Sequence, residues 1–288
     1  MLNLYKAIKK FIRSKRHRLS RHLFAESILK KRGLEYRANE IEILGIGSSH
    51  CTRGFDTDML DKAFNLGVVD QDLYTTHWIF DQYLDKLPQL KKVVAFYSIH
   101  SQGHELCKTQ SFKNTAVSHY VFGVPYHVNW LKQWEKAAKH RFKKFDDSHI
   151  DYKSFSGYIP EKKNLNVIPM GPEARCAHHL RENKRFVKQN HHLYEMAEEC
   201  QERGIQFFVV IAPARSDFLK ELDRQKANEN DLFYDLYKWA KEKKIPVLNE
   251  LKGKGYEWDD FSDTDHLDIS GAKKLTRKIA KFIDEPLK

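Results

Sequence analysis

The chain has 288 residues, of which 41% are hydrophobic, and a formal net charge of +11. That length is enough for one large domain or two small ones, and the composition excludes a globally disordered chain. No apolar run approaches the roughly 18 residues that a membrane-spanning helix needs, and basic residues interrupt the N-terminal positions where a secretory signal would lie. We therefore expect a soluble, cytoplasmic protein.

Most of the positive charge lies at the N-terminus. Residues 1–40 contain 12 Lys and Arg but only three Glu, a local charge of +9 out of the total of +11. Apolar residues recur there at helical spacing, at Leu4, Ile8, Phe11 and Ile12. We predict a basic amphipathic helical segment over 1–40. Two interpretations stay open: residues 1–32 bind an anionic membrane surface, at the inner membrane face, or the helix packs on the domain or on a second subunit. Without an aromatic stacking platform, nucleic acid is not an expected partner.

Residues 41–288 alternate between apolar runs and amphipathic segments. The expected strands are the apolar runs 41–47, 63–68, 91–97, 205–211 and 245–248. The expected helices are 73–87, 194–203, 231–243 and a last one that begins near 270 and ends before Pro286. Apolar strands that alternate with helices are typical of a parallel sheet with helices on both faces. The sequence predicts a three-layer α/β domain.

The segment 103–190 interrupts this alternation. It is rich in aromatic and basic residues and has few strand-like runs. We predict a mostly helical insertion after the third strand, lying over the carboxyl edge of the sheet, where ligands bind in such folds. The alternative is a scaffolding excursion that does not contact substrate.

Cysteine and histidine spacing does not predict a metal site. The four cysteines, which show no CxxC spacing, are Cys51, Cys107, Cys176 and Cys200, and we expect them to be reduced and packed as small apolar residues. Two adjacent histidine pairs occur at 178–179 and 191–192. Neighbouring side chains on a helix face different ways, so we expect packed or solvated histidines and no metal.

Two short motifs could carry chemistry. The first strand ends in Gly-Ile-Gly-Ser-Ser-His at 45–50, and a serine at a strand-to-helix turn projects its hydroxyl where backbone N–H groups converge. Asp263 and His266 stand three residues apart just before the last helix, so the carboxylate can fix the imidazole tautomer. Taken singly, the turn could bind phosphate or cap a helix, and Asp265 or Asp268 could cap the helix that follows.

Together the motifs resemble the SGNH (GDSL-like) hydrolase superfamily, and most closely its members in bacterial surface-polysaccharide acylation. The matching segments are Gly47-Ser48-Ser49, Asn65-Leu66-Gly67, and Asp263 to Ala272, and the resemblance covers about 40–110 and 205–285. It implies an SGNH/flavodoxin-like sheet, with Ser49 as nucleophile, His266 as general base and Asp263 as its orienting carboxylate. The resemblance also implies that the backbone N–H groups of Ser49 and Gly67 bind the oxyanion.

The sequence departs from that family after the third strand. The block that normally supplies an asparagine oxyanion donor is replaced by Tyr-Ser-Ile-His-Ser-Gln at 97–102. Ser98, His100 or Gln102 could donate instead, and losing one donor typically costs about 10²- to 10³-fold in rate. Two further residues are candidates for substrate binding: Arg215 for an anionic group, with a surface ion pair as the alternative, and Trp258 for a sugar ring, with ordinary loop packing as the alternative.

The resemblance implies a serine-dependent O-acyltransferase, and O-acetylation of a capsule or other surface glycan is the reading we favour. A carbohydrate is then the substrate and acetyl-CoA the expected acyl donor, with no tightly bound cofactor. Two alternatives remain: a carbohydrate O-acetyl esterase that uses the same serine, and a non-catalytic SGNH-fold protein of glycan assembly.

Overall fold

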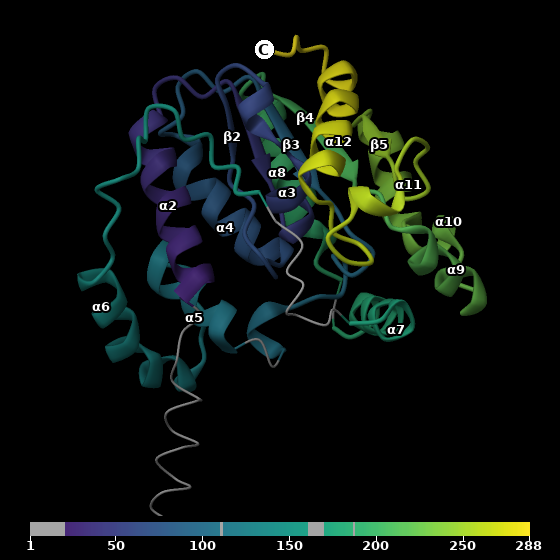
Figure 1. Ribbon diagram of the computed structural model, residues 1–288, viewed down its shortest axis with the longest axis horizontal. Helices are drawn as coiled ribbons and strands as arrows, with labels where there is room; N and C mark the ends of the chain where they lie inside the picture. Colours follow the sequence, from purple (N-terminus) through teal and green to yellow (C-terminus); the bar gives the residue numbers. More distant parts are fainter. Residues whose placement is uncertain (1–20, 110–111, 161–169, 187) are drawn as a thin grey trace, which may run out of the picture.

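The computed structural model describes residues 21–109, 112–160, 170–186 and 188–288 (Figure 1). The amphipathic positions predicted between Leu4 and Ile12 lie outside these ranges. Within them, no helix is both long enough and apolar enough to cross a lipid bilayer.

Five parallel strands form the single sheet of the described residues, in the order β2-β1-β3-β4-β5. The strands are β1 Ile43–Ile46, β2 Ala63–Asn65, β3 Lys92–Phe96, β4 Gln206–Ile211 and β5 Val247–Asn249. The strand order reverses between β1 and β3, because β2 lies on one side of β1 and β3 lies on the other. In such folds, ligands bind at this point, outside the carboxyl ends of the strands. The strand β1 therefore delivers the Gly-Ser-Ser turn to the position where a site is expected.

Helices surround the sheet in the following order. They are α2 Arg21–Arg37, α3 Ser49–Gly54, α4 Leu73–Leu84, α5 Phe112–Phe122, α6 Glu135–Lys143, α7 Pro172–Asn183, α8 Asn190–Glu202, α9 Ser216–Arg224, α10 Glu229–Leu232, α11 Tyr234–Lys243 and α12 Ile269–Phe282. Short 3-10 turns occur at Thr57–Met59, Leu106–Lys108, Asn129–Trp134 and Trp258–Asp260.

The sheet has an apolar core on each face. Successive strand residues point to opposite sides, so that Val93 packs with α2, α4 and α8 whereas Val94 packs with α3 and α12. On the second side, Leu275 and Ile279 of α12 are fully buried. Because helices cover both faces, the strands need apolar residues throughout. The predicted three-layer α/β architecture is confirmed.

The stretch between β3 and β4 is helical, and its two parts lie in different places (Figure 1). The helix α5 packs against α2, and Asn114 near its start donates to Asp70 in the loop after β2. The helix α7 packs against α9 and approaches the loop that precedes α12. Whether the whole segment 103–190 contacts substrate stays a prediction.

The described part of the basic N-terminal segment packs on the domain. The helix α2 buries Leu23, Phe24, Ile28 and Leu34 in the core. Its basic side chains bind the chain's own groups: Lys31 donates to the Val121 carbonyl, Arg32 pairs with Asp147 and Arg37 pairs with Glu40. These three side chains therefore have partners within the domain.

Lys30 is the most constrained of these side chains. It is 0% exposed, and its ammonium donates to the Gly67 carbonyl at 2.6 Å and to Asn65 Oδ1 at 3.3 Å. Burial removes water from the ammonium and lowers the pKa of Lys30 from 10.5 to about 8, against the opposing field of Glu26. The folded chain therefore releases this proton at a lower pH than the unfolded chain does.

We expect the free energy of unfolding to rise between pH 8 and pH 10.5 because of Lys30. In that window the unfolded chain binds more protons at this site than the folded chain, so stability increases with pH, by about 3 kcal/mol in all. Urea unfolding at several pH values would show this rise in the wild type and its loss in Lys30→Met. The control is Lys31→Met, a change at the adjacent lysine, which should keep the rise; an unchanged slope in Lys30→Met would contradict the prediction.

Candidate active site

Ser49 is placed by a turn that requires glycine. At Gly47, directly after β1, the backbone φ is +131°, and a Cβ atom there would lie 2.8 Å from the Phe96 carbonyl oxygen. Only glycine combines that conformation with that approach to β3. The turn ends at Ser48, the N-cap of α3, and Ser49 becomes the first residue of the helix. Its hydroxyl is thus held at the carboxyl end of β1.

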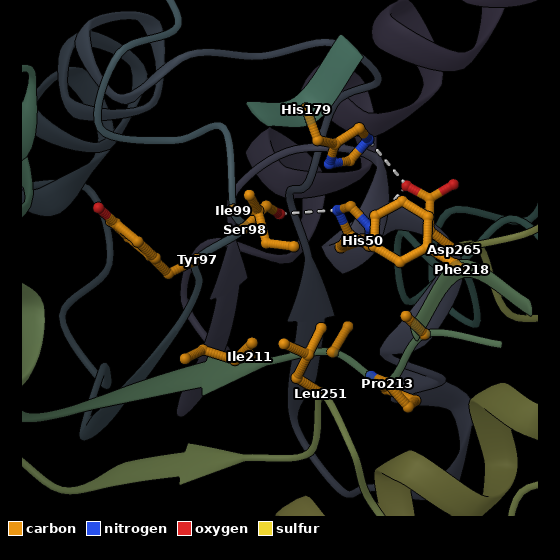
Figure 2. A pocket seen from close by; sticks show the side chains of 12 residues that line it. His50, Tyr97, Ser98, Ile99, His179, Ile211, Pro213, Phe218, Leu251 and Asp265 are labelled. Carbon is orange, nitrogen blue, oxygen red and sulfur yellow. Dashed lines mark hydrogen bonds and ion pairs between the residues drawn. The ribbon is translucent and has the colours of Figure 1, made fainter. Parts of the chain in front are cut away.

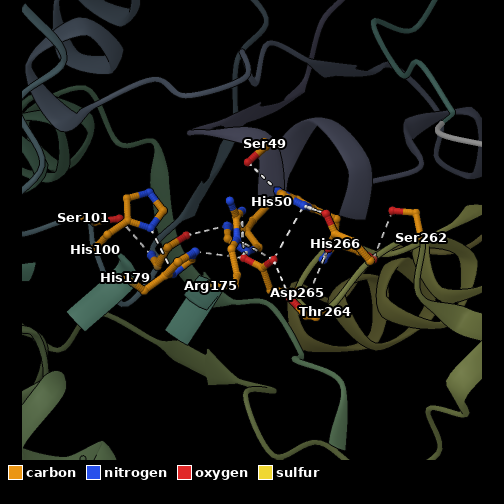
Figure 3. A network of polar contacts seen from close by, with 12 residues as sticks. Ser49, His50, His100, Ser101, Arg175, His179, Ser262, Thr264, Asp265 and His266 are labelled. Atoms are coloured by element: carbon orange, nitrogen blue, oxygen red, sulfur yellow. Dashed lines mark hydrogen bonds and ion pairs between the residues drawn. The ribbon is translucent and has the colours of Figure 1, made fainter. Parts of the chain in front are cut away.

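Ser49, His266 and Asp263 form a continuous hydrogen-bonded chain, and Figure 3 shows Ser49 beside His266. The Ser49 hydroxyl lies 2.8 Å from His266 Nε2, and His266 Nδ1 lies 2.8 Å from Asp263 Oδ2. With Nδ1–H donating to the carboxylate, Nε2 carries the lone pair that faces the serine. The other oxygen of Asp263 accepts the backbone N–H groups of Asp265 and His266 at 2.9 and 2.8 Å. The loop therefore fixes the carboxylate and the imidazole together.

The charges around His266 favour its protonated form. Burial alone would lower the pKa of His266, but the carboxylates of Asp265 and Asp263 outweigh it and raise the pKa above 6.5. The pKa of Asp263 is lowered, because its bond to His266 outweighs the effect of burial. An imidazolium that forms here is stabilised by two carboxylates, which is what a general base needs after it takes a proton.

Asp265 is the second carboxylate, and it lies under the imidazole rather than at the start of α12. Its side chain is 3% exposed, and Arg175 of α7 donates to both of its oxygens, at 2.9 and 3.1 Å. His179, one helical turn on, is 3.0 Å away, and His266 Nδ1 is 3.7 Å away. The N-cap of α12 is Asp268. The capping role considered for Asp265 is therefore wrong, and its function is to hold charge beside His266.

A row of neutral histidines continues from this cluster. His50 stacks on His266 with ring centroids 5.1 Å apart, and its Nδ1 forms a 2.7 Å hydrogen bond with the Ser98 hydroxyl. Burial lowers the pKa of His50 and His100, and it lowers the pKa of His179 to about 4. These rings are therefore uncharged at pH 7. His50 and His179 border a cavity of about 20 Å³ between the sheet and α9, which has room for a water molecule but not for an acyl group (Figure 2).

The predicted oxyanion donors differ in whether they already have a hydrogen-bond partner. The Ser49 N–H is at the first position of α3 and has no acceptor within that helix. The Gly67 N–H, in contrast, donates to Asn65 Oδ1 at 3.0 Å and is already used. The Ser98 hydroxyl is bonded to His50, and the Gln102 amide donates to Asn183 Oδ1 at 2.9 Å. Of these four groups, the Ser49 N–H alone has no hydrogen-bond acceptor among the described residues. Nδ1 of His100, the remaining candidate, lies 3.3 Å from His179 Nδ1.

Asn65 explains why the Gly67 amide is engaged. Its side-chain amide donates to the carbonyl oxygens of Cys51 and Phe55 in and after α3, at 2.9 and 2.7 Å. Its Oδ1 faces Lys30 and the Gly67 N–H. The asparagine therefore joins the nucleophile helix to the loop after β2, and Lys30 of α2 supports the same junction. The sequence motifs identified Asn65 and Gly67. They did not identify Lys30, whose partner Gly67 lies 37 residues further along the chain.

Arg215 and Trp258 lie together beside the loop that carries His266. The Arg215 N–H donates to the Thr264 carbonyl, and its guanidinium lies 3.9 Å from the centre of the Trp258 ring. Nε and one terminal nitrogen of the Arg215 guanidinium donate to the two carboxylate oxygens of Asp217, at 2.9 and 2.8 Å. The ion pair considered as the alternative for Arg215 is thus present, and a role of Arg215 in binding a substrate anion stays a prediction. Trp258 is 55% exposed.

No known family model matches the sequence, and no curated protein matches it. Three solved structures share its general architecture. One, from Desulfitobacterium hafniense, is designated a lipolytic protein of the G-D-S-L family, with 12% identity, a TM-score of 0.41, and 84% of this chain and 98% of that chain covered. A second, designated an acylhydrolase, from Bacteroides fragilis, has 13% identity, a TM-score of 0.43 and coverages of 88% and 95%. A third, designated a platelet activating factor, from Streptococcus pneumonia, has 10% identity, a TM-score of 0.42 and coverages of 88% and 91%. The chemistry of this site therefore rests on its own hydrogen-bond geometry.

Proposed function

We propose that this chain is a serine-dependent acyl-ester enzyme. The observation that carries the proposal is the chain of two 2.8 Å contacts from Ser49 through His266 to Asp263. In that arrangement a hydroxyl, a general base and an orienting carboxylate have the order that nucleophilic acyl transfer requires. The motif resemblance to SGNH hydrolases gives the same three roles to the same three residues.

The first half-reaction forms an acyl-enzyme. His266 Nε2 takes the Ser49 proton while Ser49 Oγ bonds to the acyl carbonyl carbon, and the carbonyl π electrons move onto oxygen. That oxyanion accepts a hydrogen bond from the Ser49 N–H, and the carboxylates of Asp263 and Asp265 stabilise the imidazolium. The imidazolium then protonates the leaving oxygen or sulfur, and the bond between it and the acyl carbon breaks.

The second half-reaction passes the acyl group to an acceptor hydroxyl. His266 again takes the proton, now from the acceptor, whose oxygen bonds to the acyl carbon. The imidazolium then returns the proton to Ser49 Oγ as the bond between Oγ and the acyl carbon breaks. We propose a carbohydrate hydroxyl as acceptor, an acetyl group as cargo and acetyl-CoA as donor, so that the reaction O-acetylates a surface glycan. The motif resemblance supports this choice, and so does Trp258, an exposed aromatic face next to the catalytic loop of a kind that packs on sugar rings. Hydrolysis uses the same residues with water as acceptor.

The nucleophile is tested by intact-protein mass after incubation with p-nitrophenyl acetate and, separately, with acetyl-CoA. We expect one acetyl adduct on the wild type and none on Ser49→Ala, with the steady-state rate falling by about 10⁴-fold or more. Ser48→Ala is the matched control: the Ser48 hydroxyl makes no capping bond to α3, so removing it should leave labelling in place.

Three outcomes separate the alternatives. Labelling by acetyl-CoA followed by transfer to a sugar acceptor supports the transferase, and labelling by p-nitrophenyl acetate with release only to water supports the esterase. An adduct that persists in Ser49→Ala, or a wild type that neither donor labels, would sink the serine mechanism and leave a non-catalytic assembly role.

A second test uses the charges that surround His266. Activity requires neutral His266, so the rate should rise with pH through a pKa that lies above 6.5. Removing the positive charge in Arg175→Met should raise that pKa further and move the acid limb of kcat/KM to higher pH. Asp265→Asn removes a negative charge and should move the same limb to lower pH. Thermal melts check that both variants fold, and shifts in the same direction would contradict the assignment, since loss of folding has no reason to move two limbs apart.

A further inference from the structure

Outside the active site, histidine and carboxylate side chains converge between α4 and α8. His77 comes from α4, and His192 and Glu195 come from one face of α8, three residues apart. The two helices pack against each other in the layer opposite α3 and α12. The other convergence of this kind in the described residues, at Asp265, belongs to the active site, where Arg175 already binds both carboxylate oxygens.

We propose that His77, His192 and Glu195 bind a divalent transition-metal ion of the Zn²⁺ class. His77 Nδ1 lies 3.2 Å from His192 Nδ1 and 3.3 Å from Glu195 Oε2, and His192 Nδ1 lies 3.6 Å from that same carboxylate oxygen. Three donor atoms from three side chains therefore form a triangle of nearly equal edges.

The size of that triangle matches one metal ion. Ligand atoms bound to tetrahedral Zn²⁺ at about 2.0–2.2 Å lie about 3.3–3.6 Å from one another. The edges here are 3.2, 3.3 and 3.6 Å. Two imidazole nitrogens and one carboxylate oxygen are a donor set for Zn²⁺ and its neighbours in the first transition series, whereas Mg²⁺ and Ca²⁺ prefer oxygen alone.

A second carboxylate orients His77. Its other ring nitrogen, Nε2, lies 3.4 Å from Glu199 Oε1, one turn beyond Glu195 on α8. A histidine that binds metal through one nitrogen usually donates its other N–H to a carboxylate, which fixes the tautomer and makes the ligand more basic. With Nε2–H directed at Glu199, His77 Nδ1 has its lone pair facing the centre of the triangle.

A metal ion fits the tautomer in which His77 donates to Glu199. If His77 holds its proton on Nε2 toward Glu199, its Nδ1 faces the Glu195 carboxylate lone pair to lone pair at 3.3 Å. That contact is repulsive without a cation between the atoms. The rings are 18% and 15% exposed and Glu195 is 51% exposed, so an ion can enter from solvent and keep water as a fourth ligand.

The pair 191–192 was expected to be packed or solvated, because no carboxylate spacing supported a metal ion. The spacing is in fact present on α8, from His192 to Glu195 and on to Glu199. What the sequence does not indicate is the ligand from α4, which lies 115 residues earlier in the chain. We therefore infer that the ion clamps α4 to α8.

The test is calorimetric titration of chelator-treated full-length protein with ZnCl₂, and separately with MgCl₂. We expect Zn²⁺ to bind and to raise Tm, and Mg²⁺ to do neither. His77→Ala and Glu195→Gln should weaken Zn²⁺ binding by at least about tenfold, and Glu199→Gln by about 10- to 100-fold through its bond to His77. The matched control is His191→Ala, next to the cluster but outside it, which should bind Zn²⁺ as the wild type does.

Cobalt gives an independent check of the geometry. Co²⁺ in the wild type should show the intense visible bands of a tetrahedral site, and these should be absent in His77→Ala. Equal Zn²⁺ affinity in wild type, His77→Ala and Glu195→Gln, or no binding at all, would overturn the proposal. The outcome is independent of the serine mechanism, because none of these four side chains belongs to the chain from Ser49 to Asp263.

Discussion

The carboxylate of Asp265 is the constraint on which the active site depends. A charge that is 3% exposed is costly to bury unless it is paired, and breaking a buried pair typically costs about 3–5 kcal/mol. Arg175 supplies the pairing in a bidentate contact, and His179 adds a further bond. The helix α7, although it belongs to the insertion between β3 and β4, is therefore part of the site. Its position fixes the loop that carries His266.

That loop and the serine turn meet because of the sheet. Ser49 and His266 are 217 residues apart, yet both lie where β1 ends. Parallel pairing places every strand's carboxyl end on one edge, so that the loops that follow the strands converge there. A tight glycine turn then aims the hydroxyl, and Asp263 holds its own loop through two backbone N–H groups. Each of these local features spans only a few residues, and the parallel sheet brings them together.

The parts of this arrangement that could be predicted from sequence are those encoded locally. Strand and helix patterns come from apolar spacing, and Asp263 and His266 are three residues apart, so both were predictable. Arg175, Lys30 and the histidine pair at 77 and 192 depend on contacts across 90, 37 and 115 residues, and a linear pattern holds no trace of them. The acceptor of the Gly67 N–H, the Asn65 side chain, could likewise be identified only from its conformation.

The wide sequence separation within the site has a consequence for how the protein is made. Strands β1, β2 and β3 lie within the first hundred residues and can pair early, but β4 can join only after the long insertion has been traversed. Closing a loop of that length slows the pairing of β4 with β3 more than it reduces the stability of the pair. During synthesis the serine turn emerges long before the loop of His266, and the buried carboxylate of Asp265 must find an Arg175 made 90 residues earlier. The nascent chain therefore has no working site until its last strand and helix have docked.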